Sequence, residues 1–224
     1  MPKEWTKASL AAAIDHSLLK AIATGEQVRE LCAEARAFGF SSVVVNPAWV
    51  ALCARELAGS AIGITAVVGF PLGANATKTK EAEAAHAVAE GATGIDMVIN
   101  LGAAKSGDWR AVEEDIRAVV KAADGVAVKV IIETCYLGNA EKAKACDAAA
   151  RAGARCVQTS TGFGTGGATV EDVRLMKKAV AEHGLAVKAS GGIRSYHEAI
   201  LMLDAGADRI GASSGVAIVS ELPE

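Results

Sequence analysis

Three features of the amino-acid sequence predict a single α/β domain folded as a (β/α)8 barrel, also called a TIM barrel. Eight short apolar runs recur along the 224 residues. They are nearly continuous rather than alternating, as expected for parallel strands buried on both faces. Longer amphipathic stretches separate the runs, and a glycine often turns the chain before the next run. Eight such units favour a closed barrel over a doubly wound open sheet, and no linker divides residues 1–224.

The predicted elements alternate along the whole chain. The predicted strands are 11–17, 41–46, 62–70, 94–100, 127–134, 154–160, 186–192 and 208–214. The predicted helices are 25–38, 77–90, 108–122, 139–152, 169–183 and 195–205. Asp108 and Ser195 stand at the first positions of their helices, where a side-chain oxygen can accept a hydrogen bond from an unpaired backbone N–H group.

Charge and cysteine content exclude several classes of protein. A net charge of −3 provides no basic field for nucleic acid or an anionic membrane. The five cysteines form no CxxC pair, which favours reduced thiols over a disulfide framework or a zinc site. No apolar run reaches the roughly 20 residues that cross a bilayer, and the first residues lack the apolar core of a signal peptide. We therefore expect a cytoplasmic protein that binds neither nucleic acid nor a membrane, and we expect no cofactor.

Charged residues interrupt three of the apolar strands. Because alternate side chains of a barrel strand point to the axis, Asp96, Lys129 and Lys188 are expected to face inward. Such groups are almost never fully buried unless paired, since an unpaired buried ion is costly. One explanation is an internal ion-pair network that fixes the strand register. The other is catalysis, because a lysine near another cation has a lowered pKa and becomes a nucleophile or a base.

Glycine-rich segments follow three consecutive strands and indicate a phosphate site. They cover residues 160–167, 190–194 and 211–215. Glycines let backbone N–H groups approach an anion, and in barrel enzymes the loops after strands seven and eight commonly bind phosphate. The predicted phosphate-binding residues are Gly162, Gly191, Gly192, Arg194, Gly211, Ser213 and Ser214.

Eight ordered motifs identify a family resemblance along nearly the whole chain. They are residues 14–19, 45–47, 68–73, 95–100, 129–134, 159–163, 188–194 and 211–215. In these motifs the chain resembles the deoxyribose-phosphate aldolases. The resemblance implies a class I aldolase that cleaves 2-deoxy-D-ribose 5-phosphate to D-glyceraldehyde 3-phosphate and acetaldehyde through a lysine Schiff base, without metal. It also suggests a homodimer.

The resemblance implies three catalytic positions, and the sequence departs from the family at one of them. In the family, a lysine directly before the Thr-Ser-Thr-Gly motif forms the Schiff base. The residue matching Lys188 lowers the pKa of that lysine, and the residue matching Asp96 moves protons. Here the Schiff-base position is Gln158. An amide nitrogen is not basic and cannot form an iminium, so we expect near-total loss of cleavage by the usual path while the fold and the phosphate site survive.

Several explanations of this departure stay open. The glutamine was introduced on purpose, or the chain is a natural non-catalytic relative that binds sugar phosphates, or Lys188 or Lys129 acts as a substitute amine. A different class of function is an isomerase or lyase on a phosphate-binding barrel, with Asp96 as base. A third is a sugar-phosphate sensor without turnover.

Further polar residues complete the predicted substrate site. Asp15 and Lys129 are expected to bind substrate from the barrel interior, Asn46 to donate to a substrate hydroxyl, and Thr159 to lie beside the reactive position. Glu133 is expected to pair with Lys129 or to orient a water. His16, at the end of the first strand, is expected to be a structural histidine at the barrel rim.

Overall fold

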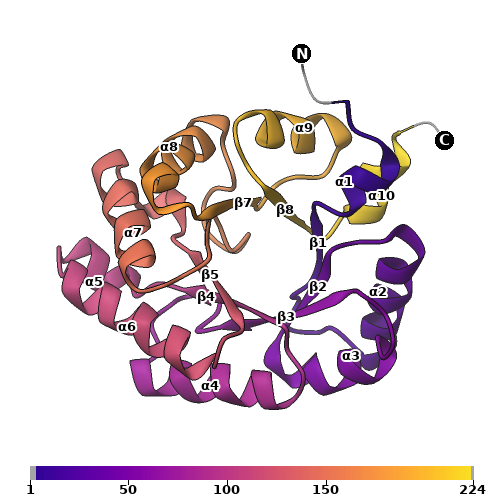
Figure 1. The fold of residues 1–224 in the computed structure, drawn as a ribbon, viewed down its shortest axis with the longest axis horizontal. Helices are drawn as coiled ribbons and strands as arrows, with labels where there is room; N and C mark the ends of the chain where they lie inside the picture. Colours follow the sequence, from indigo (N-terminus) through magenta and orange to yellow (C-terminus); the bar gives the residue numbers. More distant parts are fainter. Residues whose placement is uncertain (1–3, 223–224) are drawn as a thin grey trace.

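The computed structural model describes residues 4–222 and confirms the closed barrel. Its eight parallel strands pair in sequence order, and β8 closes the sheet by pairing with β1 (Figure 1). The strands are β1 (Ile14–Leu18), β2 (Ser42–Val45), β3 (Gly63–Val68), β4 (Gly94–Val98), β5 (Ala127–Ile131), β6 (Cys156–Gln158), β7 (Ala186–Ser190) and β8 (Arg209–Ala212). Seven of them lie within the predicted apolar runs, and β1 extends one residue beyond its run, to Leu18.

Helices form the outer ring around the barrel in Figure 1. The six predicted helices correspond to α2 (Gly25–Phe38), α4 (Thr77–Ala89), α6 (Trp109–Ala122), α7 (Asn139–Arg151), α8 (Val170–Val180) and α9 (Tyr196–Asp204). Asp108 caps α6 by accepting a hydrogen bond from the Ala111 N–H at 3.0 Å. Four helices were not predicted, namely α1 (Lys7–Ala11), α3 (Val50–Glu56), α5 (Leu101–Lys105) and α10 (Gly215–Ser220).

The apolar core lies between the strands and the helix ring. Ile95 and Met97 on β4 are fully buried beneath the helices, while Asp96 between them points to the axis. On α6, Val112, Ile116 and Val119 recur at helical spacing and are also fully buried. Burying such side chains contributes about 1.5–3 kcal/mol each, so the outward faces of the strands hold the fold together. The inward faces carry polar groups together with apolar residues such as Val44, Val67 and Ile131.

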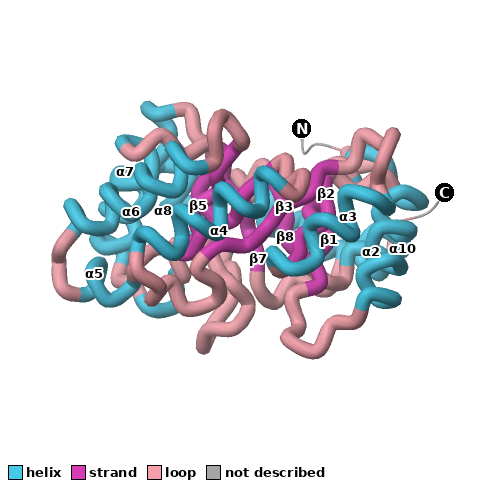
Figure 2. Tube along the Cα trace, turned by 90° about the horizontal axis from the view of Figure 1, so that it is seen from below, coloured by secondary structure: helices cyan, strands magenta, loops and turns pink. Residues whose placement is uncertain are grey.

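The loops at the carboxyl ends of the strands position the site. Figure 2 shows the strands in the middle of the molecule and the loops above and below them. All the strands except β1 end one to three residues before their predicted ends, and the largest difference is at β5, which ends at Ile131. Glu133 adopts a left-handed conformation with φ 50°, which breaks the strand geometry expected up to residue 134.

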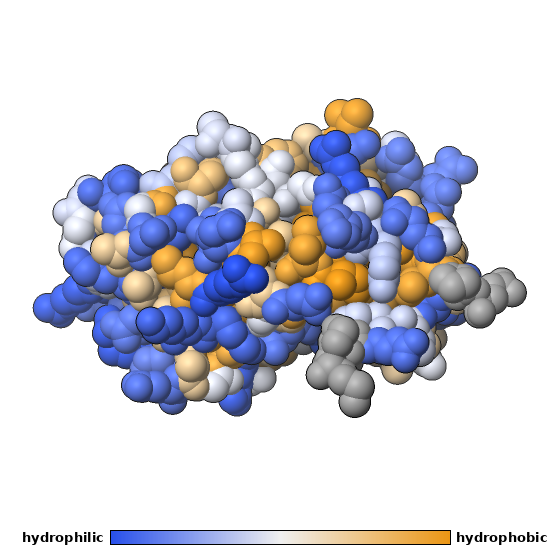
Figure 3. Space-filling view, turned by 90° about the horizontal axis from the view of Figure 1, so that it is seen from above, coloured by the Kyte–Doolittle hydropathy of each residue, from blue (hydrophilic) through white to orange (hydrophobic). Residues whose placement is uncertain are grey.

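The side of the molecule drawn in Figure 3 is mostly hydrophilic. Figure 3 shows one side of the molecule, on which polar and charged side chains surround smaller apolar areas. Among residues 4–222, no helix combines the length and the apolar character needed to cross a membrane.

Candidate functional site

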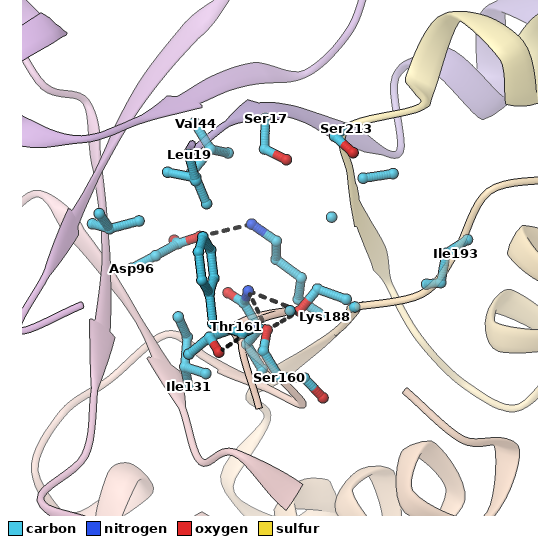
Figure 4. A pocket seen from close by; sticks show the side chains of 18 of the residues that line it. Ser17, Leu19, Val44, Asp96, Ile131, Ser160, Thr161, Lys188, Ile193 and Ser213 are labelled. Atoms are coloured by element: carbon cyan, nitrogen blue, oxygen red, sulfur yellow. Dashed lines mark hydrogen bonds and ion pairs between the residues drawn. The ribbon is translucent and has the colours of Figure 1, made fainter. Parts of the chain in front are cut away.

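A cavity of about 270 Å³ opens at the carboxyl ends of the strands. Figure 4 shows Ser17, Leu19 and Val44 on one side of it, with Ser160 and Thr161 opposite. All eight strands contribute to its wall. The strand residues that line it include Ser17, Leu18, Val44, Val67, Asp96, Ile131, Gln158, Lys188, Ser190, Gly211 and Ala212. A ligand bound here would contact the whole sheet.

An ion-pair network runs along the barrel axis below this cavity. The Lys188 ammonium lies 2.7 Å from Asp96 and 2.8 Å from Asp15, and all three side chains are 1% exposed. Asp96 also binds Lys129 at 2.8 Å, and Asp15 binds Arg209 at 3.0 Å. Each buried carboxylate is therefore shared between two cations, which satisfies the charges predicted on the inward faces.

The network keeps Lys188 charged. Burial opposes the charged form of Lys188, but the negative charges of Asp15 and Asp96 outweigh it and raise the pKa of the amine above its usual value. Burial likewise opposes ionisation of Asp15, yet Lys188, Lys129 and Arg209 bring the pKa of that carboxyl below its usual range. The lowered lysine pKa considered from the sequence does not occur at Lys188, because two carboxylates contact it.

Gln158 lies beside Lys188 in the strand register. Its Nε2 donates to Ser190 Oγ at 2.9 Å, and Ser190 Oγ donates its single hydrogen to the Ser160 carbonyl at 2.6 Å. Because that hydrogen is committed, Ser190 can only accept from Gln158, which fixes the orientation of the amide. Gln158 Oε1 is then buried without a hydrogen-bond partner among the described residues.

Two cations and several glycines form the rim of the cavity. The side chains of Lys20 and Arg194 are exposed and form no hydrogen bond or ion pair with other residues of the described range 4–222. Gly191 has φ 89°, and a Cβ there would lie 3.1 Å from the Ser160 Cβ. Only glycine fits this conformation and spacing without strain. The rim combines free positive charge with accessible backbone, as an oxyanion site requires.

Glu133 anchors the segment after β6 rather than binding Lys129. It accepts hydrogen bonds from the Thr161 backbone N–H at 3.2 Å and from the Thr161 hydroxyl, and it is 1% exposed. Burial raises the pKa of this carboxyl, and the two bonds from Thr161 oppose that rise. The expected pairing with Lys129 is wrong, because Lys129 is occupied by Asp96.

The structure brings most of the predicted site residues to the cavity. Those that line it are Asp96, Gln158, Gly162, Lys188, Gly191, Gly192, Arg194, Gly211 and Ser213. Asn46 instead donates to the Leu19 carbonyl at 3.3 Å, and the Thr159 hydroxyl donates to the Ser190 carbonyl at 2.9 Å. Ser214 precedes α10 outside the lining. His16 faces away from the axis and binds Glu34 at 2.7 Å.

Asp15 and Lys129 line a second cavity, of about 260 Å³, at the amino ends of the strands. They therefore contact the substrate cavity only through Lys188 and Asp96. Alternation along a strand gives the face on which a residue lies, but it does not give the depth along the axis, which depends on the stagger of the strands.

Sequence reasoning missed the apolar part of the wall. Phe70 and Phe163 line the cavity from the loops after β3 and β6, and their rings meet edge to face at 5.4 Å between centroids. Lys20 was missed because no glycine-rich segment accompanies it. Ser17 had a detectable signal, since it shares the inward parity of Asp15. Among residues 4–222, no group of three or more His, Cys, Asp or Glu side chains is arranged to hold a metal ion.

Comparisons with known proteins agree on one family. The model of the DeoC/LacD family aldolases matches residues 9–221. A deoxyribose-phosphate aldolase from Carboxydothermus hydrogenoformans is 57% identical over 217 residues, covering 95% of each chain. One from Caldanaerobacter subterraneus subsp. tengcongensis is 53% identical over 224 residues, covering 99% of this chain and 96% of the relative. A solved structure described as a tetrameric deoxyribose phosphate aldolase from Aeropyrum pernix is 36% identical, with a TM-score of 0.91 and coverage of 96% and 92%.

Proposed function

The chain belongs to the DeoC/LacD family of aldolases, and on that premise we propose that its single-domain barrel is a deoxyribose-phosphate aldolase in which Gln158 blocks the covalent step. The reaction of this enzyme is reversible cleavage of 2-deoxy-D-ribose 5-phosphate to D-glyceraldehyde 3-phosphate and acetaldehyde. The observation that carries the proposal is the place of residue 158. It lies on the cavity wall, next to Lys188 and below a rim that carries the exposed side chains of Lys20 and Arg194.

The cavity suits a sugar phosphate bound in one orientation, with its phosphate at the rim. Lys20, Arg194 and the glycines of the rim supply positive charge and backbone donors for the phosphate. The far end of a five-carbon chain then reaches toward Lys188 and Asp96. The Lys188 ammonium donates two of its three hydrogens to carboxylates, which leaves one donor for a substrate oxygen. These residues bind and orient the substrate, and Asp96 is placed to exchange a proton with Lys188.

Gln158 removes the nucleophile from this arrangement. Cleavage of the carbon–carbon bond needs an iminium as electron sink, and an amide cannot form one because its lone pair is delocalised. A lysine at this position would lie beside the Lys188 ammonium, and a neighbouring cation lowers the pKa of an amine. The proposal therefore places the loss of activity in the chemical step and not in binding.

Lys188 is a poor substitute amine. A protonated amine has no lone pair, and Asp15 and Asp96 raise the pKa of Lys188. Lys129 lines the second cavity and is also bound by Asp96. Misplacement of a reacting group by about 1 Å already costs about a hundredfold in rate. Both lysines are thus expected to leave the aldehyde unreacted.

The test compares the chain with its Gln158→Lys variant. With acetaldehyde and borohydride, we expect no modified lysine in the chain and a single reduced adduct at residue 158 in the variant, mapped by mass spectrometry. The variant should also recover cleavage of 2-deoxy-D-ribose 5-phosphate by several orders of magnitude. An adduct at Lys188 or Lys129 in the unchanged chain would support the substitute amine, and an inactive but folded variant would contradict the aldolase assignment.

We also propose a cytoplasmic homodimer. The five cysteines are all free thiols, which suits a reducing compartment. The proposal of a dimer rests on the family resemblance. The alternative is a tetramer, the state described for the Aeropyrum pernix relative. Light scattering on the purified chain distinguishes a dimer from a tetramer or a monomer.

A further inference from the structure

The second cavity departs from the usual interior of a barrel. Bulky branched side chains normally fill that interior. At the amino end of this barrel, the residues at the cavity wall are instead small on four strands, namely Gly63, Gly94, Ala127 and Ala186. A Cβ at Gly94 would lie 2.8 Å from Thr65 Oγ1 and 3.3 Å from Lys129 Nζ. A side chain at residue 94 would therefore collide with Thr65 and crowd the Lys129 ammonium.

Positive charge exceeds negative charge around this cavity. Lys129, Arg155 and Arg209 line it, against the single carboxylate of Asp15. When the ion pairs behind the wall are included, four cations face two carboxylates, because Lys188 and Asp96 complete the network. The Cys156 thiol in the wall is neutral, since burial raises its pKa to about 12. Two positive charges are left without a matching carboxylate in this group.

Arg155 carries one of these unmatched charges. Its side chain is exposed and makes no hydrogen bond or ion pair with any residue of the described range. By contrast, Lys129 forms an ion pair with Asp96, and Arg209 forms one with Asp15. An anion in front of them would not have to displace these carboxylates, because Lys129 and Arg209 carry more N–H donors than the carboxylates use.

Neutral hydroxyl groups complete the wall. The hydroxyl oxygen of Ser41 accepts from Arg209 and that of Thr65 accepts from Lys129, so both keep their own hydrogens to donate. The Thr93 hydroxyl instead donates to the Ile64 carbonyl at 3.4 Å. A tetrahedral oxyanion presents oxygens in several directions, and guanidinium groups match that geometry with paired N–H donors. The volume of about 260 Å³ is large enough for such an ion with bridging water.

We propose that the cavity at the amino end of the barrel is a second anion site, which binds a phosphate-sized oxyanion between Arg155, Arg209 and Lys129. It lies at the opposite end of the barrel from the substrate cavity. The ion-pair network of Asp15, Lys188 and Asp96 separates the two sites. The proposal does not rest on the aldolase assignment or on the identity of residue 158.

Equilibrium dialysis with radiolabelled inorganic phosphate, at constant ionic strength set with chloride, tests the site. The rim of the substrate cavity is also proposed to bind phosphate, so we expect two equivalents per chain. Arg194→Gln should remove the equivalent at the rim and leave one. Adding Arg155→Gln to that variant should raise the Kd of the remaining bound phosphate at least tenfold. Arg174→Gln is the matched control and should change neither equivalent, because Arg174 is an exposed arginine on α8 whose side chain has no hydrogen bond or ion pair within residues 4–222.

Arginine modification provides a readout tied to the residue. In the Arg194→Gln variant, phosphate should slow the reaction of Arg155 with phenylglyoxal at least fivefold and should not slow the reaction of Arg174. Mass spectrometry measures the modification of each arginine over time. If this variant binds no phosphate, or if Arg155 is neither required nor protected, the second site is overturned. If Arg155→Gln alone abolishes all binding while the rim stays intact, the second site stands and the phosphate rim of the proposed function fails.

Discussion

At the scale of single residues, Asp15 and Asp96 determine the electrostatics of the site. Each is almost completely buried and accepts contacts from two cations. In the Schiff-base mechanism a second amine would share this environment, and its charge would compete with Lys188 for the same carboxylates. With an amide at residue 158 the competition is absent, and Lys188 is held in its charged form. The charged form of Lys188 is therefore set by Asp15 and Asp96.

Asp15→Asn tests this network through the pH dependence of stability. Removing one partner of a buried ion pair costs about 3–5 kcal/mol, so the variant should be less stable by that amount at pH 7. The folded pKa of Asp15 is lowered from 3.8, so its contribution is present above pH 3.8 and is lost as the pH falls toward the folded pKa. Urea denaturation between pH 2 and 7 should show the two free energies of unfolding converging at the acid end. A constant difference across this range would mean that the charge of Asp15 does not act.

At the scale of elements, a second buried ion pair joins two outer helices to the barrel. Lys80 on α4 donates to Asp115 on α6 at 2.6 Å and to the Val98 carbonyl at the end of β4 at 2.9 Å. Thr77 donates to the other oxygen of Asp115 at 2.8 Å. The pair lies outside both cavities, and it fixes α4 and α6 relative to the strand that carries Asp96. We assign it a structural role.

A double-mutant cycle measures the strength of that connection. Lys80→Met should destabilise the fold by about 3–5 kcal/mol, because Asp115 is left buried without its cation. Combining it with Asp115→Leu should recover part of the loss, since two apolar side chains leave no unpaired charge. Free energies of unfolding from urea titration give the coupling. Additive losses would show that the two side chains do not stabilise each other.

The predicted strands and helices can be compared with those of the structure. The strands were predicted because runs of β-branched and apolar residues between glycines have few other interpretations, and six helices had caps or glycine stops. The short helices α3 and α5 were missed, since seven and five residues carry little periodicity. Glu133 was misplaced because its left-handed backbone and its bonds to Thr161 are tertiary features. Inward parity identified Asp96, Lys129 and Lys188, but which cavity each residue lines depends on the stagger of the strands.

At the scale of the whole molecule, the two cavities and the ion-pair network form one polar axis inside an apolar shell. The wall of the substrate cavity includes at least one residue from every strand. Closing the sheet thus brings together groups from residue 17 to residue 213 that are far apart in the chain. Ligand binding and barrel closure are therefore expected to be linked, and unfolding of any strand should destroy the site.

This linkage predicts the response of stability to ligand. A ligand that binds only the folded chain stabilises it by about 2.7 kcal/mol at a concentration one hundred times its Kd. For a domain of this size, that corresponds to a rise in Tm of roughly 5–10 °C. We expect 2-deoxy-D-ribose 5-phosphate to produce this rise in a single cooperative transition, because the proposed function places the effect of Gln158 in the chemical step and every strand contributes to the cavity wall. Arg194→Gln should reduce the rise at the same concentration, whereas Arg174→Gln should not. Calorimetry that shows no rise, or a separate transition for part of the barrel, would contradict the coupling of the site to the closed sheet.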